Sequence, residues 1–463
     1  MSADQDQAAP TNTPARRNRR KRRTKSRKAT AQRRGSGRAR RIAVRVVLAL
    51  LPLLIWQGTL LFVQMKARTL IAERQIEDAR SWLGWVNSFS FRSGTNEFLL
   101  ARCARKLGDY QATSAHLQTA LYYGYDKETI QREQWLALAQ TGDLAKSEPH
   151  LSELLVDHRG DGQEICEAYV LGYLLIQQYA GAEELLRGWS DSYPEDSQPW
   201  FMRGIINRNL GQWKSAETAF RKVIELSPDH HEASFHLGSV LLTLKNTEEA
   251  LKFLKRASQD EEYRIESQVG QAHCYRLLGQ PAQTRKILET VLRDHPTDSS
   301  AGLEMGRLAL DDGDYATAVT WLEPLADKDP RNTDARYALA SALLQVGRSE
   351  DAQAHFSAVN LMNDELANAN QIAETITTKP DSAADRMKVA AAQLKYGSQE
   401  EGLFWLRSAI SVNPTYRPAL EALVKYYERK VRENPETPQY KTTAQKFRTM
   451  LQKLPLVPAP PVE

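Results

Sequence analysis

The residues of this chain that could do chemistry are few and widely separated. Cys103, Cys166 and Cys274 lie 63 and 108 residues apart, whereas metal-binding cysteines come in closely spaced pairs. No Walker loop and no GxSxG, GxGxxG or HExxH motif occurs. We therefore expect three buried structural thiols, no catalytic site and no cofactor, so that the protein is not an enzyme.

Two short clusters of possible metal ligands are equally weak. His230, His231 and His236 fall on a turn and the start of a helix. The stretch 311–314 reads Asp-Asp-Gly-Asp, but no further ligand follows at the spacing of a calcium loop. Turn and helix-start chemistry accounts for both clusters, and we expect no metal site.

The composition indicates a folded, water-exposed protein with a strongly basic start. The chain has 463 residues, of which 41% are hydrophobic and 26% charged, values that exclude a fully disordered chain and a polytopic membrane protein. Residues 1–65 carry 16 Lys or Arg and only Asp4 and Asp6, whereas the remainder has more acidic than basic residues. The net charge of +5 therefore describes a basic arm joined to an acidic body.

The first 65 residues predict a tail and a membrane span. Residues 1–41 contain no Val, Ile, Leu, Phe, Tyr or Trp, so we expect a disordered basic cytoplasmic tail. Residues 42–65 follow as a predicted transmembrane helix, because the uncharged run 46–63 would span about 27 Å. A cleaved signal peptide or a buried helix of a soluble domain is the alternative. The basic flank would stay in the cytoplasm, near anionic lipid, and place residues 66–463 outside it.

A 34-residue repeat fills the rest of the chain. Glycine recurs on this period, and proline at 194, 228, 296, 330 and 414 follows the same grid. Nine positions on the grid are all Leu or Phe: Leu117, Leu151, Leu186, Phe220, Leu254, Leu288, Leu322, Phe356 and Leu406. Each unit predicts two helices joined by a tight turn, which a glycine with positive φ closes. Small residues such as Gly204, Gly238 and Gly306 would let the two helices approach, and the Leu or Phe would fill the resulting hole.

This pattern resembles the tetratricopeptide repeat, best in WFMRGIINRNLGQWKSAETAFRKVIELSP at 200–228 and GRLALDDGDYATAVTWLEPLADKDP at 306–330. The resemblance implies an all-α, right-handed superhelical solenoid of helix-turn-helix repeats, preceded by the transmembrane helix and the disordered tail. The expected organisation is a degenerate leading unit at 66–93, a solenoid at 94–362, an inserted segment at 363–382, a C-terminal unit with capping helices at 383–454 and a Pro-rich tail at 455–463. The inserted segment could be an extra helix or a hinge.

In the family that the chain resembles, the first helix of each unit lines a groove that holds peptides or helices. Carried over by position, the expected groove residues are Phe201, Ile205, Arg208, Asn209, Phe235, His273, Arg276, Leu303, Arg307 and Tyr337. The arginines could hold a carboxylate through two parallel hydrogen bonds, and the rings could anchor apolar groups. The alternative is that some of these groups pack on neighbouring units.

The sequence therefore predicts a single-pass, membrane-anchored interaction scaffold with an extracytoplasmic solenoid. In a bacterium, the membrane would be the inner one and the solenoid would face the periplasm. The expected partners are a protein or peptide in the groove and lipid around the anchor, in an envelope, secretion or polymer-export complex. The alternative is a cytoplasmic or nucleoid-associated adaptor whose basic arm binds nucleic acid. That arm lacks aromatic residues for stacking on bases, so nucleic acid is the less favoured partner.

Overall fold

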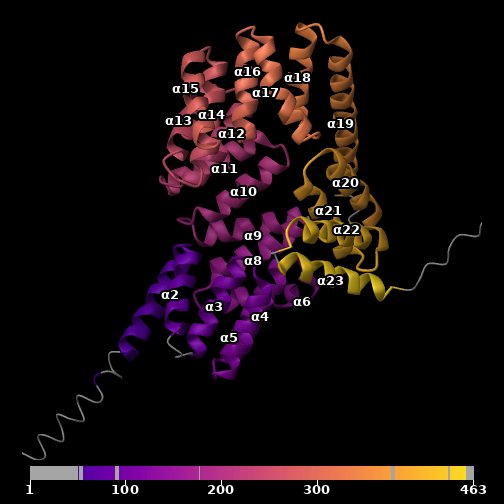
Figure 1. Cartoon of the computed structure of the whole chain (residues 1–463). Helices are drawn as coiled ribbons and strands as arrows, with labels where there is room; N and C mark the ends of the chain where they lie inside the picture. Colours follow the sequence, from indigo (N-terminus) through magenta and orange to yellow (C-terminus); the bar gives the residue numbers. More distant parts are fainter. Residues whose placement is uncertain are drawn as a thin grey trace, which may run out of the picture. The chain divides into compact units, whose positions relative to one another are not determined.

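The described part of the chain is helical throughout. The computed structural model describes residues 51, 56–88, 93–176, 178–376, 381–435 and 438–454, and no strand occurs among them (Figure 1). The chain forms two compact units, unit 1 (Met1–Gln134) and unit 2 (Trp135–Glu463). The predicted tails at 1–41 and 455–463 lie outside the described residues.

Unit 1 begins with a pair of helices at the place of the expected leading unit. Its helices are residues 56–72, α2 (Ile76–Ser88), α3 (Gly94–Lys106), α4 (Tyr110–Tyr122) and the start of α5 (Lys127–Gln140). The helix over 56–72 packs one face on the next two helices, through a core of Val63, Ala67, Leu70, Ile71, Ala79, Leu83, Val86, Leu99, Leu100 and Cys103. Ala79, Leu83 and Val86, which the repeat grid singles out, are fully buried.

The predicted membrane span at 42–65 falls only in part on described residues. Residues 56–65 belong to the helix that continues to residue 72, and Val63 within it is buried in unit 1. In the part of the chain that the structure describes, no helix is both long and apolar enough to cross a bilayer.

Unit 2 continues as a succession of helices, and each pair within a repeat is in contact. They are α6 (Leu144–Ser147), α7 (Leu151–Val156), α8 (Gly162–Leu175), α9 (Tyr179–Ser192), α10 (Gln198–Asn209), α11 (Trp213–Leu226), α12 (His231–Thr243), α13 (Thr247–Ala257), α14 (Arg264–Leu277), α15 (Pro281–Asp294), α16 (Ser299–Asp311), α17 (Tyr315–Lys328), α18 (Thr333–Gln345), α19 (Ser349–Ile376), α20 (Ala383–Tyr396), α21 (Gln399–Val412), α22 (Arg417–Glu433) and α23 (Pro438–Gln452). A 3-10 turn at Glu148–His150, with Pro149 inside it, separates α6 from α7.

Within a repeat, a large side chain of the second helix packs against a small residue of the first helix. A Cβ atom on Gly306 would lie 2.5 Å from Cγ of Leu322, and one on Gly204 would lie 2.6 Å from Cε1 of Phe220. Both large side chains are fully buried. The predicted register of the small and large slots is therefore confirmed at these units.

The ends of the helices follow local sequence signals. Asp298 and Asn332 precede α16 and α18, and their side chains accept hydrogen bonds from the N–H groups of Ala301 and Ala335, as N-cap residues do. The turn residue Gly313 has the predicted positive φ, 77°. Lys245, which occupies the same slot where the repeat lacks glycine, also has a positive φ of 62°.

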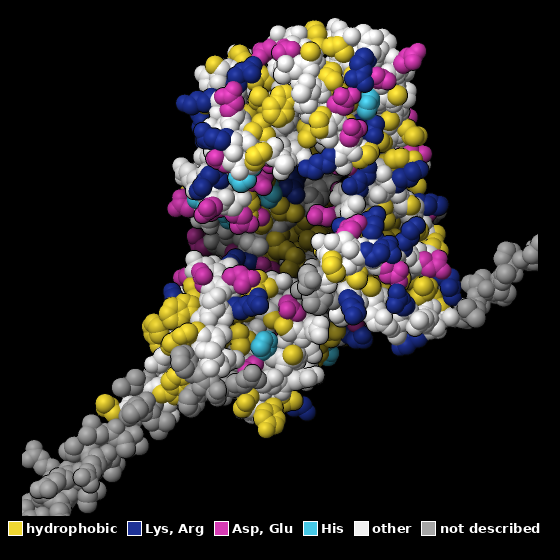
Figure 2. Space-filling model, viewed as in Figure 1, with side chains coloured by type: hydrophobic (Ala, Val, Ile, Leu, Met, Phe, Trp, Pro, Cys, Tyr) yellow, Lys and Arg dark blue, Asp and Glu magenta, His cyan; other side chains and the backbone are white. Residues whose placement is uncertain are grey.

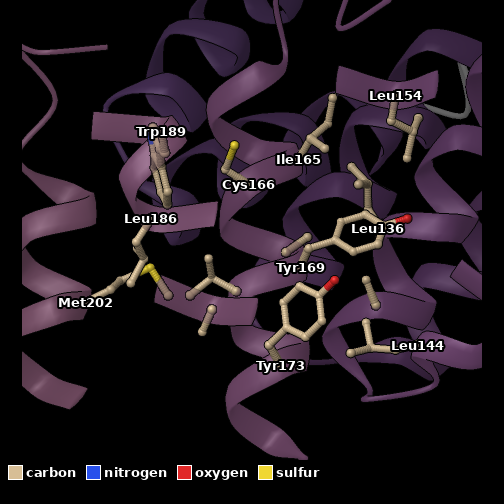
Figure 3. Close-up of a cluster of buried hydrophobic side chains, with 14 residues drawn as sticks. Leu136, Leu144, Leu154, Ile165, Cys166, Tyr169, Tyr173, Leu186, Trp189 and Met202 are labelled. Atoms are coloured by element: carbon tan, nitrogen blue, oxygen red, sulfur yellow. The ribbon is translucent and has the colours of Figure 1, made fainter. Parts of the chain in front are cut away.

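The start of unit 2 has an aromatic core (Figure 3). Tyr169 and Trp189 are almost completely buried, beside Ile165, Cys166 and Leu186. Their polar atoms find partners, because the Tyr169 hydroxyl donates to the carbonyl of Ser147 at 2.6 Å and the Trp189 Nε1–H donates to Asp196 at 2.9 Å. The rings thus contribute apolar area without leaving a buried donor unpaired.

The expected insertion at 363–382 is largely helical. It continues α19 as far as Ile376, and residues 377–380 lie outside the described part. Ala369 and Ile376 of this extension are buried against Val389 of α20. The inserted residues therefore lengthen the second helix of a repeat and give it an additional apolar contact.

Gly306→Ala should destabilise the protein. The added methyl group would overlap Leu322, which is enclosed, so we expect the free energy of unfolding to fall by about 1–2 kcal/mol even after the gain in helix propensity. Gly188→Ala in α9 is the matched control, because nothing lies within 4 Å of a Cβ there. It should be neutral or raise stability by up to ~1 kcal/mol. Urea unfolding compares the two variants with the wild type. Equal shifts of the urea midpoint for Gly306→Ala and Gly188→Ala would contradict the register.

Lys245→Gly should stabilise the protein. Glycine adopts positive φ without the steric cost that lysine incurs, and this gain exceeds the greater freedom of glycine in the unfolded chain, giving about 0.5–1 kcal/mol. Lys252→Gly, inside α13, should instead cost about 1 kcal/mol. Thermal unfolding followed by circular dichroism compares them, and a lower melting temperature for Lys245→Gly would refute the strain argument.

Candidate partner-binding groove

All ten predicted groove residues lie on the first helices of successive repeats. They come from α10, α12, α14, α16 and α18, which we call the first-helix face. Among them, α12 contacts α14, α14 contacts α16, and α16 contacts α18. The repeat therefore places the predicted side chains along one continuous row of helices, and the structure contains no ligand that tests their role.

Two of the predicted aromatic anchors pack between repeats. Phe201 of α10 stacks on His230 with ring centroids 5.0 Å apart. Phe235 of α12 lies 5.8 Å from the ring of Tyr263. Both phenylalanines are half-buried, so each offers only part of its ring to a ligand. This is the alternative that the sequence left open.

The predicted apolar positions differ in how much they expose. Ile205 and Leu303 are partly buried against the cores of their repeats. Tyr337 of α18 is 59% exposed, with its ring 5.4 Å from that of Phe356. The α18 end of the face therefore presents the most accessible predicted aromatic side chain.

Arg208 occupies the α10 end of the face without a carboxylate partner in the described chain. Its guanidinium donates to Nδ1 of His236 at 2.8 Å and to Oδ1 of the exposed Asn209 at 3.3 Å. An arginine can only donate, so Nδ1 of His236 must be the acceptor. Burial lowers the pKa of Arg208, and the charge of Glu232 opposes that shift only in part. A half-buried cation is thus held in place by neutral groups.

Arg276 and Arg307 bind carboxylates of this chain. The buried side chain of Glu304 accepts from Arg276 Nε at 3.0 Å and from Arg307 at 2.9 Å, and lies 3.0 Å from Nδ1 of His273. Arg276 also pairs with Asp311 at 2.8 Å, and Arg307 with Asp334 at 3.0 Å. The expectation that these two arginines await a ligand must therefore be revised, because both charges are already compensated.

Glu304 is ionised despite its burial. Burial alone would raise its pKa, but the hydrogen bond and charge of His273, together with Arg276 and Arg307, outweigh that effect and lower the pKa to about 2. Sequence reasoning selected His273, Arg276 and Arg307 and missed the carboxylate that joins them. The signal that could have found it is spacing, since Arg276 and Glu304 are 28 residues apart.

The same spacing recurs elsewhere in the chain. Arg208 and His236 are also 28 residues apart, as are Arg105 and Glu133, a buried ion pair of unit 1. In each pair, the twelfth position of one repeat meets the sixth position of the next, a separation of one 34-residue repeat minus six positions. These contacts link consecutive repeats.

The three cysteines are buried and unpaired with one another. Burial raises the pKa of the Cys166 and Cys274 thiols to about 12, so neither is a thiolate near neutral pH. Their expected burial is confirmed, and their positions favour packing over reactivity.

The histidine and aspartate clusters serve the local structure. His230 accepts from the N–H of Ala233 at the start of α12, and Asp314 accepts from the N–H of Thr317 at the start of α17. Across the described residues, no group of three or more His, Cys, Asp or Glu is arranged to hold a metal ion.

A pocket of about 330 Å³ lies away from the predicted groove residues, between α22 and α23. Its lining is Glu428, Val431, Arg432, Lys441, Ala444, Gln445 and Arg448. Its residues were not among the sequence-predicted sites.

Glu304→Gln should remove a pH-dependent part of the stability. The folded pKa of Glu304 lies below its ordinary value of 4.5, so the carboxylate stabilises the fold above about pH 4.5 and this contribution fades as the pH falls toward about 2. The shift corresponds to ~3 kcal/mol. In urea unfolding, the free energy of unfolding of the wild type should thus exceed that of Glu304→Gln by a large margin at about pH 6. This difference should narrow at about pH 3. Glu225→Gln is the control, because Glu225 is exposed and forms a surface ion pair with Lys222. The free energy of unfolding of Glu225→Gln should stay within ~0.5 kcal/mol of the wild-type value at both pH values.

Comparisons with known proteins agree on the type of repeat. Tetratricopeptide-repeat family profiles match residues 201–262, 266–298 and 309–372. No curated protein matches the chain. Among solved structures, the chain is similar to PilW, a type IV pilus biogenesis factor, with 18% identity, a TM-score of 0.37 and coverage of 49% of this chain and 96% of that one. It is also similar to YrrB, described as a tetratricopeptide-repeat protein with an unusual peptide-binding site, with 16% identity, a TM-score of 0.29 and coverage of 52% and 98%.

A third similar structure is the MamA protein, with 16% identity, a TM-score of 0.29 and coverage of 37% of this chain and 94% of that one. The assignment depends on the family profiles and on the helix pairs, whose small and large slots follow the repeat. Residues 201–262, 266–298 and 309–372 are therefore tetratricopeptide repeats, within a succession of helix pairs that is helical throughout its described part.

Proposed function

We propose that this protein is a membrane-anchored scaffold whose first-helix face binds a protein segment with acidic and apolar side chains. The segment would belong to a partner in an envelope, secretion or polymer-export complex. The observation that carries the proposal is Arg208, whose guanidinium forms no ion pair among the described residues and which lies about two turns from Phe201 on α10. A carboxylate of the partner would supply that counter-charge.

The distribution of charge along the face favours one orientation of the bound segment. Arg276 and Arg307 are already compensated by Glu304, Asp311 and Asp334. An acidic group is therefore best placed near α10, and an apolar group near Tyr337 on α18. Hydrogen bonds to charged groups contribute about 1.5–3 kcal/mol, so Arg208 would dominate charge recognition.

The membrane part of the proposal is supported by sequence. The uncharged run 46–63 follows 16 basic residues, an arrangement typical of an anchor with its amino terminus in the cytoplasm. Residues 66–463 would then lie outside the cytoplasm. A reporter fused after Glu463 that is active only in the cytoplasm would overturn this topology and favour the nucleic-acid-binding adaptor.

Arg208→Ala should abolish most of the ligand affinity. Random peptides displayed on phage and selected on the purified protein should become rich in Asp, Glu and apolar residues. Fluorescence anisotropy should then show that Arg208→Ala binds the selected peptides about 10- to 100-fold more weakly. Arg293→Ala is the control, because Arg293 is exposed on α15, a second helix.

Added salt should weaken binding to the wild type more than to Arg208→Ala, since salt screens an exposed charge pair. If Arg208→Ala keeps its fold by circular dichroism and binds the selected peptides as tightly as Arg293→Ala does, the proposed role of the first-helix face is wrong.

A further inference from the structure

Unit 1 exposes large apolar side chains on two neighbouring helices. Leu61, Phe62 and Met65 on the helix over 56–72 are 60%, 60% and 70% exposed. Trp82 and Trp85 of α2 are 41% and 48% exposed. The Phe62 and Trp82 rings meet edge to face with centroids 6.5 Å apart, so the two sets are joined. Figure 2 shows hydrophobic side chains gathered on the outer side of α2. We call these five residues the aromatic surface.

This surface is separate from the core of unit 1. The same helix buries Val63, Ala67 and Leu70 on its other face, against α2 and α3. At 100° per residue, Leu61 and Met65 lie opposite these three residues. The helix is therefore apolar on both faces up to Met65, a pattern that water-exposed helices avoid.

The outer face changes character at one point. From residue 56 to Met65 the helix has no charged residue, and from Lys66 onward its outer positions include Arg68 and Thr69. Neither Lys66 nor Arg68 has an ion-pair partner in the described parts of the chain, and both are exposed. An apolar stretch that ends at basic residues is what a helix shows where it passes from hydrocarbon to water.

We propose that the aromatic surface lies in the interface of a lipid bilayer and holds unit 1 against the membrane. This inference rests on the membrane attachment proposed above. Lipid is favoured over a protein partner because the uncharged run 46–63 leads directly into the helix that carries Leu61 and Phe62. Tryptophan, with an apolar ring and one N–H donor, is enriched at the level of lipid headgroups. Lys66 and Arg68 would reach anionic headgroups beside it.

The geometry predicts more than an anchor. A span alone would leave unit 1 free to tilt in the water beside the membrane. With the aromatic surface embedded, α2 would lie close to the headgroups, and its two tryptophans would sit at the depth of the upper acyl chains, where an amphipathic surface of this kind binds.

The test uses the full chain in vesicles of zwitterionic and anionic phospholipid. A Trp85→Cys variant is labelled with an environment-sensitive fluorophore, and the control is Trp213→Cys in α11 of unit 2, because Trp213 is also partly exposed. Cys103, Cys166 and Cys274 are buried and should not react in the folded protein. Nitroxide carried on shallow acyl positions should quench the label at position 85 at least about twofold more than the label at position 213.

An alkaline wash of the vesicles separates this inference from the membrane span. Quenching at position 85 in a chain that resists the wash supports both. Equal, weak quenching at positions 85 and 213 in a chain that resists the wash overturns the aromatic surface and leaves the anchor standing. Quenching at position 85 in a chain that the wash removes supports the aromatic surface and overturns the span.

Discussion

The contact between a large apolar side chain and a small residue on the facing helix determines the geometry of this protein. Leu322 against Gly306 and Phe220 against Gly204 leave no room for a methyl group between the helices. Each contact fixes how closely the two helices of a repeat approach. The same contact therefore determines how that helix pair packs against the next pair. Because this arrangement recurs every 34 residues, the first helices of successive repeats lie in a row.

Charge placement follows from that row. Once first helices stack with a constant offset, the twelfth position of one repeat meets the sixth position of the next. An arginine at the twelfth position can then form an ion pair with an acidic residue at the sixth position of the next repeat. Arg276 meets Glu304 in this way. Arg208 meets His236 instead, which accepts a hydrogen bond but supplies no negative charge. The residue at one position of a repeated contact thus decides whether the arginine forms an ion pair or a hydrogen bond to a neutral group.

The sequence predicts those parts of the structure that depend on local signals and on the repeat. Gly313 and Leu322 could be placed because a turn and a packing slot each recur every 34 residues. Glu304 could not be placed from local signals, because its role depends on contacts with His273, Arg276 and Arg307, which come from two different helices. The sequence also left open whether the inserted segment continues α19 as a helix. Its residues Ala369 and Ile376 are buried only because they pack against α20. The helix over 56–72 packs one face on unit 1, which apolar content alone does not reveal.

The buried carboxylate also limits what the first-helix face can recognise. For an external carboxylate to bind Arg276, it would have to displace Glu304, and the displaced charge would remain buried next to its former partners. Breaking a buried pair in this way costs several kcal/mol, more than a new exposed ion pair returns. At Arg208 no such exchange is needed, because only hydrogen bonds to His236 and Asn209 are rearranged. In the proposed function, the face would therefore discriminate by position: it would accept negative charge at α10, resist it at α14 and α16, and offer apolar surface at α18.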